Sequence, residues 1–110
     1  MAQKQSSSPQ RAAMQRISEL LGRGAGPDRM DREVDAIVSR LRAEGEAEQV
    51  QEWLETLRDG FAENAEAALE AVDEIESTEK AARRHAENAA RAIAACRDAF
   101  SRHLRAPVAA

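Results

Sequence analysis

Between Glu46 and Arg105 the sequence contains a single glycine and no proline. From Val50 to Ile75 its apolar residues recur at steps of three and four, which is the spacing of one face of an α-helix. The rhythm continues, at first on alanines alone, at Ala82, Ala86, Ala89, Ile93, Cys96, Phe100 and His103. A row sustained over this many turns predicts long helices that pack as in a coiled coil.

The composition agrees with a helical fold. The chain has 110 residues, enough for one small domain, and only 3% of them are aromatic. A sheet protein would need more β-branched and aromatic residues. Two shorter amphipathic helices are predicted over residues 9–22 and 29–44. They are separated by a segment rich in glycine, and Asp28 is the expected N-cap of the second helix.

The long stretch changes from acidic to basic near its middle, and a turn is predicted at 76–79. Folding the stretch about this turn pairs Leu54 with Phe100 and Phe61 with Ile93, so that large residues meet large residues at the open end. One continuous helix about 90 Å long, held in an oligomer, is the alternative, because no glycine or proline marks the turn.

The predicted fold is therefore all-α: a long antiparallel helical hairpin, coiled-coil-like in its packing, with two short N-terminal helices. Its parts are a flexible polar tail at 1–8, the two short amphipathic helices at 9–44, the hairpin at 45–106 and a frayed end at 107–110. The hairpin seam, which is predicted to carry protein interactions, consists of Leu54, Leu57, Phe61, Leu69, Val72, Ile75, Ile93 and Phe100. At Gly60, where two steps of four meet, a local unwinding or a kink of the helix is expected.

The net charge of −4 conceals a strong segregation. Residues 1–27 carry +3 and residues 80–110 carry +5, whereas residues 28–79 hold seventeen acids against five arginines, a net charge of −12. Seven acids at helical spacing form a row, called here the acidic face: Glu48, Glu52, Glu55, Asp59, Glu63, Glu66 and Glu70. Such a row is either a solvated helix face or a docking surface for a basic partner. The basic C-terminal helix is the expected neighbour that offsets its self-repulsion.

Basic residues near the N-terminus are the candidate phosphate contacts: Lys4, Arg11, Arg16 and Arg23. The C-terminal basic residues lack interleaved aromatic side chains for base stacking, and the neighbouring acidic stretch repels a polyanion. A helix-turn-helix is disfavoured because the glycine-rich connector is long and the second helix begins with acids. Nucleic acid is therefore a less favoured partner than protein.

Residues able to carry chemistry are sparse, and no catalytic, cofactor-binding or metal-binding residues are predicted. Cys96 and His103 share a helix face, but two ligands are too few for a metal site, and no third group orients them for thiol catalysis. A single cysteine forms no internal disulfide and fits a reducing compartment. No apolar run is long enough to cross a membrane, and the polar first residues lack the apolar segment of a secretory signal. We expect a cytoplasmic protein without a membrane partner.

These features predict a non-enzymatic helical interaction or oligomerisation module, such as an adaptor, an assembly factor or a secretion-type chaperone. The thin, alanine-lined hairpin buries little area by itself, so a homo-oligomer with a further protein partner is expected. The alternative is a small nucleic-acid accessory protein, of the phage-packaging or plasmid-mobilisation type, with an oligomeric helical core and a basic N-terminal arm. An enzyme is the least supported class.

Overall fold

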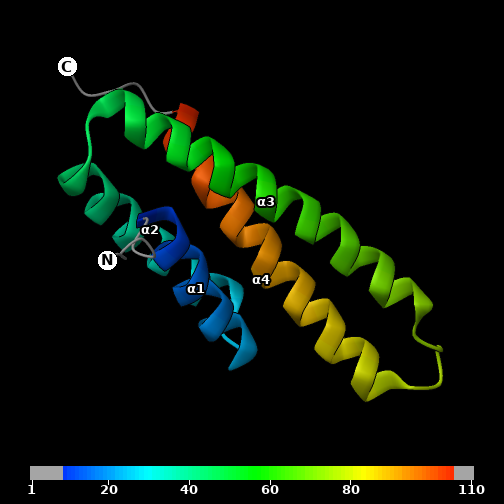
Figure 1. The fold of residues 1–110 in the computed structure, drawn as a ribbon. Helices are drawn as coiled ribbons and strands as arrows, with labels where there is room; N and C mark the ends of the chain where they lie inside the picture. Colours follow the sequence, from blue (N-terminus) through cyan, green and yellow to red (C-terminus); the bar gives the residue numbers. More distant parts are fainter. Residues whose placement is uncertain (1–8, 106–110) are drawn as a thin grey trace, which may run out of the picture.

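The computed structural model describes residues 9–105, and this part of the chain is helical throughout apart from short connections (Figure 1). Four helices follow one another: α1 (Pro9–Gly22), α2 (Pro27–Glu44), α3 (Ala47–Glu74) and α4 (Lys80–Arg105). The prediction of an all-α fold is confirmed. The predicted tails at 1–8 and 107–110 lie outside the described residues.

The two N-terminal helices are joined by a short glycine-rich turn. α1 ends at Gly22, and Gly24 adopts a left-handed φ of 83°, which a residue without Cβ reaches at little cost. α2 begins at Pro27 with Gly26 as its N-cap, so the prediction of Asp28 as the cap is wrong. Proline suits the first helical position because its missing N–H would have no intrahelical acceptor there. Asp28 lies in the first turn, near the positive end of the helix dipole.

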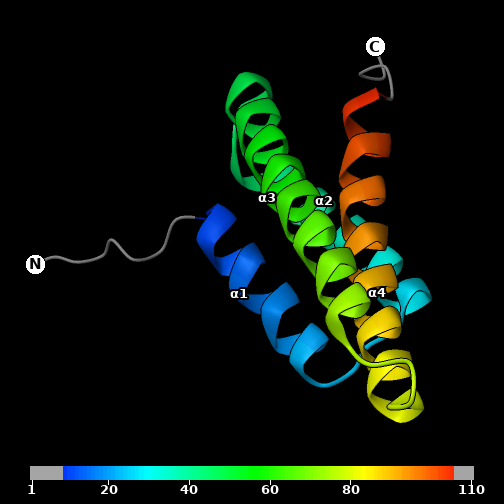
Figure 2. The same ribbon diagram turned by 90° about the vertical axis from the view of Figure 1, so that its right-hand side faces the viewer.

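α3 and α4 lie side by side, run in opposite directions, and extend beyond the other two helices as an arm (Figure 1). α4 packs extensively against both α3 and α2, whereas α2 and α3 make little contact with each other. α1 lies on one side of the α3–α4 pair and touches all three other helices (Figure 2). The described residues thus form a four-helix body at one end and a two-helix arm at the other.

α4 meets α2 through a row of small residues that ends in charged ones. Arg102 Nη2 lies 2.8 Å from Asp31 Oδ1, and His103 Nε2 lies 2.7 Å from Asp35 Oδ1. The small residues that lead to these contacts at helical spacing are Ala92, Cys96 and Ala99, all fully buried. Their short side chains allow α2 to approach α4 closely.

The core lies in the four-helix body, where large residues of α3 and α4 meet those of α1 and α2. Phe61 stacks on Phe100 with the ring centroids 5.9 Å apart. The prediction paired Phe61 with Ile93 and Phe100 with Leu54, and it did not include the stack of the two phenylalanines on each other. Leu54 and Phe61 are seven residues apart, close to two helical turns, so they lie on the same face of α3 and the apolar pattern does not decide which of them Phe100 contacts.

α3 continues as an α-helix through Gly60, so the predicted unwinding there is wrong. Gly60 lies where α1 crosses α3, and a methyl group at this position would lie 3.4 Å from Met14 Cε. The glycine in α3 therefore coincides with close approach of a neighbouring helix, and tertiary packing keeps the helix intact despite its weak propensity.

The C-terminal end of α3 is closed by a side chain from α4. Arg83 donates hydrogen bonds from Nη1 to the carbonyl oxygens of Val72, at 3.1 Å, and Ile75, at 3.0 Å. α3 has no basic residue in its own last turn, so this guanidinium supplies the donors and the positive charge that a helix C-terminus needs. The bonds tie the first turn of α4 to the last turn of α3 and help to set the register of the two helices.

Two glycine substitutions are expected to change stability in opposite directions. Gly45→Ala places a methyl group 2.7 Å from the ring of Trp53, and this overpacking is expected to destabilise the fold by about 1–2 kcal/mol. Gly60→Ala meets only Met14 at van der Waals distance and removes a flexible residue from a helix interior, so it is expected to stabilise by about 0.5–1 kcal/mol. Urea unfolding followed by circular dichroism measures both; shifts of the same sign would contradict these contacts.

Arg83→Met keeps most of the aliphatic stem of the side chain but removes both hydrogen bonds to the end of α3. A loss of about 1–2 kcal/mol in the free energy of unfolding is expected, because charged donors to partly buried carbonyls contribute more than exposed ones. Arg84→Met is the matched control, since the neighbouring Arg84 is exposed, and a change within about 0.5 kcal/mol is expected there. Equal effects of the two substitutions would exclude the capping role.

Candidate interaction surface

The cysteine and the histidine that share a face of α4 are buried and paired, respectively. The Cys96 thiol is fully buried, and burial, with a smaller contribution from the charge of Asp31, raises its pKa to about 12. His103 is engaged by Asp35, and no group of three or more metal-binding side chains occurs among the described residues. An un-ionised thiol in a packed core is a poor nucleophile and a poor metal ligand.

The predicted seam residues divide between the core and the surface. Leu54, Leu57, Phe61, Val72 and Phe100 are buried, and Ile75 and Ile93 are half-buried. Leu69, however, is 59% exposed. It lies three residues before Val72 and four after Ala65, a spacing that puts it beside the buried row, at the edge of the contact with α4. Most of the seam therefore holds the molecule together, and only its half-buried and exposed members remain accessible to a partner.

The acidic face is solvent-exposed along the whole length of α3. Its described ion pair is local, between Asp59 and the adjacent Arg58 at 3.0 Å, and Glu55 accepts a hydrogen bond from Gln51 at 3.2 Å. The expectation that α4 offsets this charge is not met by the ion pairs found within residues 9–105. The basic residues of α4 that pair across helices contact α2 instead, and the hydrogen bond from Arg102 to Asp31 raises the pKa of the guanidinium.

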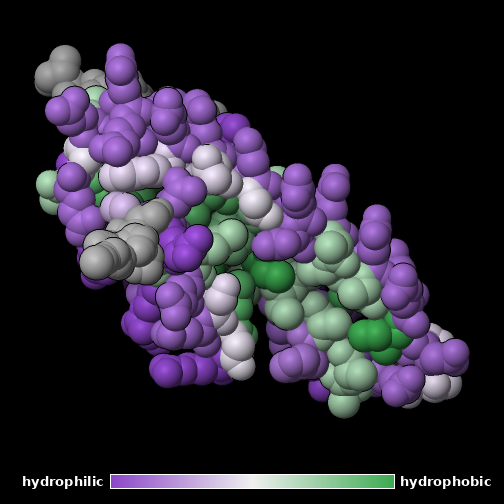
Figure 3. Space-filling view, in the orientation of Figure 1, coloured by the Kyte–Doolittle hydropathy of each residue, from purple (hydrophilic) through white to green (hydrophobic). Residues whose placement is uncertain are grey.

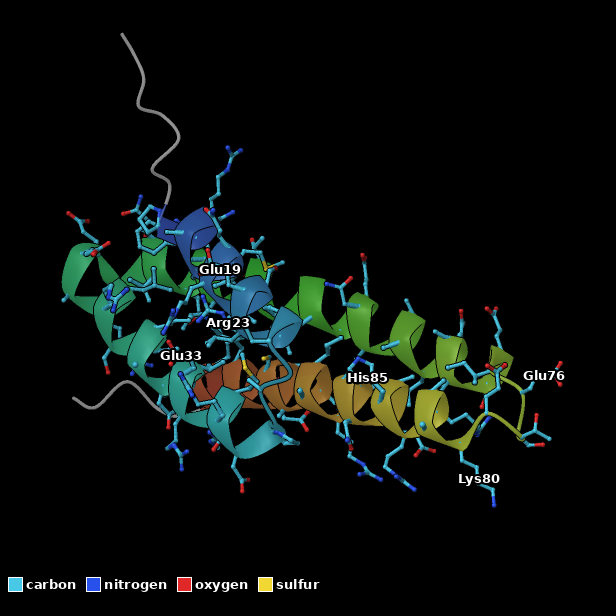
Figure 4. The ribbon with its side chains drawn as sticks, turned by 90° about the horizontal axis from the view of Figure 1, so that it is seen from below. Glu19, Arg23, Glu33, Glu76, Lys80 and His85 are labelled. Atoms are coloured by element: carbon cyan, nitrogen blue, oxygen red, sulfur yellow. The ribbon has the colours of Figure 1, made fainter. Side chains whose placement is uncertain are left out.

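The candidate phosphate contacts do not form a separate basic patch. Lys4 lies outside the described residues. Arg16 pairs with Glu33 at 3.0 Å, and Arg11 and Arg23 are exposed on or just after α1. Figure 4 shows Arg23 at the α1–α2 end of the molecule together with Glu19 and Glu33, far from Lys80 and His85 on the arm. Acids and bases alternate here, which weakens attraction for a polyanion.

The arm carries an apolar surface on the side where α1 packs. Met14 of α1 contacts α3 at Gly60. The residues that continue this side of α3 at helical spacing are the exposed Asn64, then alanines, and then Ile75. On α4 an apolar row that starts at Ala82 leads into the buried Cys96 and Phe100. The exposed and half-buried members of both rows are called here the distal apolar face: Ala67, Ala68, Ala71, Ile75, Ala82, Ala86, Ala89 and Ile93.

The space-filling view shows this face as a green expanse on the arm, bordered by hydrophilic residues and not covered by α1 (Figure 3). α1 occupies the same side of the α3–α4 pair nearer the body, where its buried residues include Ile17 and Leu20. The distal apolar face is thus the continuation of a surface that the chain itself covers with a helix at one end. Sequence reasoning placed alanines in the hairpin but assigned them to its inner seam.

A hollow lies between α1 and α3, where α1 packs on this surface. It is lined by Gln10, Arg11 and Met14 of α1 and by Thr56 and Leu57 of α3. Leu57 is buried and Thr56 is exposed, so the hollow lies at the edge of the contact. Arg11, a basic side chain of α1, is therefore close to the flank of α3.

Comparison of the chain with protein-family models, with curated proteins and with solved structures gives no match. No helix among residues 9–105 is both long and apolar enough to cross a membrane. The candidate site therefore rests on the geometry of the arm.

The Cys96 thiol is expected to react slowly in the folded protein. Raising its pKa from 9.0 to about 12 lowers the thiolate fraction at pH 8 about a thousandfold. Because the unfolded chain loses this proton near pH 9 and the folded chain retains it, the thiol is expected to lower stability as pH rises from 9 to 12. Stopped-flow labelling with a disulfide reagent, with and without urea, measures the first effect. Equal rates in both conditions would show that the thiol is accessible.

Proposed function

We propose that this protein is a non-enzymatic helical interaction module of the adaptor or assembly-factor kind. The observation that carries the proposal is the distal apolar face, an uncovered helix surface that continues the surface on which α1 packs. Contiguous exposed apolar surface on a small protein is typical of an interaction site. The buried Cys96 and the paired His103 leave no comparable basis for an enzyme.

The proposal includes coiled-coil-like packing of the arm with a further helix. A two-helix layer leaves one apolar side of each helix exposed, and a third or fourth helix completes a bundle. The occupant is either a second copy of the chain, which would make the protein a homo-oligomer, or a helix of another protein, as expected of an adaptor or a secretion-type chaperone. Nucleic-acid binding is the weaker proposal because Arg16 is engaged by Glu33.

Site-specific photo-crosslinking tests whether the arm is a docking surface. A benzophenone amino acid placed at Ala71 or Ala89 is expected to give a discrete adduct in the cell of origin, because both residues are exposed members of the distal apolar face. The same group at Ser39, an exposed position on α2, is the control and is expected to give none. An adduct whose mass is that of two 12.0 kDa chains would identify a second copy.

A companion variant separates specific docking from chance contact. Ala71→Glu introduces a charge into the apolar face and is expected to abolish the adduct formed from Ala89, while circular dichroism and the unfolding midpoint stay close to wild type, because Ala71 is exposed. No adduct from either face position, or adducts that persist in Ala71→Glu, would overturn the proposed function.

A further inference from the structure

The geometry points to one kind of occupant: we propose that the distal apolar face binds a single amphipathic helix of a partner protein whose basic residues lie along the flank nearest α3. The inference rests on the proposed function, since it names the partner of the same surface. Three features of the described residues support it. A helix, α1, already packs on the neighbouring surface, acidic residues lie beside the face, and these acids would repel their counterparts in a second copy of the chain.

α1 shows what this surface accepts. It is an amphipathic helix of 14 residues that contacts α2 as well as α3 and α4, and its buried residues are Ala13, Ile17 and Leu20. With residues that are mostly alanine, the distal apolar face continues the surface on which α1 packs. Small side chains let a helix backbone approach closely, so a helix fits this surface better than an extended segment or a loop. Helix-in-groove recognition reads anchor residues at i, i+3, i+4 and i+7.

The flank of α3 beside this surface belongs to the acidic face. Thr56 lines the hollow beside Arg11 where α1 sits. The residues that follow Thr56 on the same side of α3, at intervals of seven, are Glu63 and Glu70, and both are exposed. A helix placed on the distal apolar face would therefore meet two carboxylates at the flank. Lysine or arginine on that side of the partner complements them and favours fast, specific docking.

A second copy fits the face less well. α1 already occupies the end of the surface nearest the body, so two copies can overlap only through their arms, with their bodies at opposite ends. A two-fold axis of this kind sets α3 against α3 of the other copy. Glu63 and Glu70 would then face identical acids across the contact, and like charges close together in an interface are repulsive.

Two designed peptides of about 18 residues test the inference. Both carry the same stripe of alanine and leucine at helical spacing; one has lysines along one flank, and the other has glutamates at the same positions. With the full chain, fluorescence anisotropy at low salt is expected to give at least about tenfold tighter binding of the lysine peptide, a preference that shrinks as salt is added. Ala71→Glu is expected to abolish binding of both peptides.

Charge reversal of the protein supplies the decisive comparison. Glu63→Lys/Glu70→Lys is expected to reverse the preference toward the glutamate peptide. Glu48→Lys/Glu52→Lys changes the net charge equally on the part of α3 nearer the body and is expected to keep the original preference. Equal binding of the two peptides, no binding of either, or an unchanged preference in Glu63→Lys/Glu70→Lys would overturn the inference.

The outcome of the crosslinking separates the two proposals. In one outcome, the Ala71 adduct contains another protein while the two peptides bind equally or the glutamate peptide binds more tightly. That result overturns the proposal of a basic helix and leaves the proposal of a docking surface intact. An adduct of two copies of the chain overturns the basic helix and leaves an oligomerising module. Failure of both experiments removes the docking surface itself.

Discussion

The fold depends on α4 packing against two helices at once. Toward α3 it presents large residues, and the stack of Phe100 on Phe61 marks that contact. Toward α2 it presents the short row of Ala92, Cys96 and Ala99. Burial of such small side chains removes little apolar area from water, so this contact contributes less per residue than the contact with α3. The exposed ion pair of Arg102 with Asp31 adds about 0.2–1 kcal/mol. Together with the hydrogen bond between His103 and Asp35, its main effect is to fix the register of α2.

The sequence predicted the helical class because Gly22, Pro27 and Gly45 mark the ends of the first two helices and little interrupts the remainder. It did not predict the stack of Phe61 on Phe100, since residues seven apart share a helix face and the apolar pattern does not tell them apart. Alanine was the second source of error. Ala92 and Ala99 are core residues, whereas Ala71 and Ala89 are exposed, and an alanine on a helix carries too weak a hydrophobic signal to tell the two apart. The distal apolar face was missed for the same reason. The acidic face, by contrast, was located correctly on an exposed side of α3, because charged side chains are seldom buried unpaired.

The described ion pairs are distributed unevenly among the four helices. The described ion pairs that cross between helices join α1 to α2 and α2 to α4, and they involve Glu33, Asp31 and Asp35. All three acids belong to α2. α3 holds the densest acidic row, yet its one described ion pair is to its own neighbour in sequence. Repulsion between acids four residues apart costs an isolated helix about 0.2–0.5 kcal/mol per pair. The packing of α3 against α4 offsets this cost within the body, where large residues are buried, more fully than along the arm, where alanines dominate.

The composition of the arm also bounds how tightly it can bind. Burial of a methyl group contributes about 0.8 kcal/mol, and most residues of the distal apolar face offer only one. Association costs at least about 4 kcal/mol in lost translational and rotational freedom. The apolar contact alone therefore leaves a small surplus, and Ile75 and Ile93, both half-buried already, add part of a side chain each. In the proposed complex, charge at the flank, through Glu63 and Glu70, would then decide which helix is bound and how fast. A surface built in this way suits reversible association that responds to ionic strength, and it suits a permanent, core-like interface poorly.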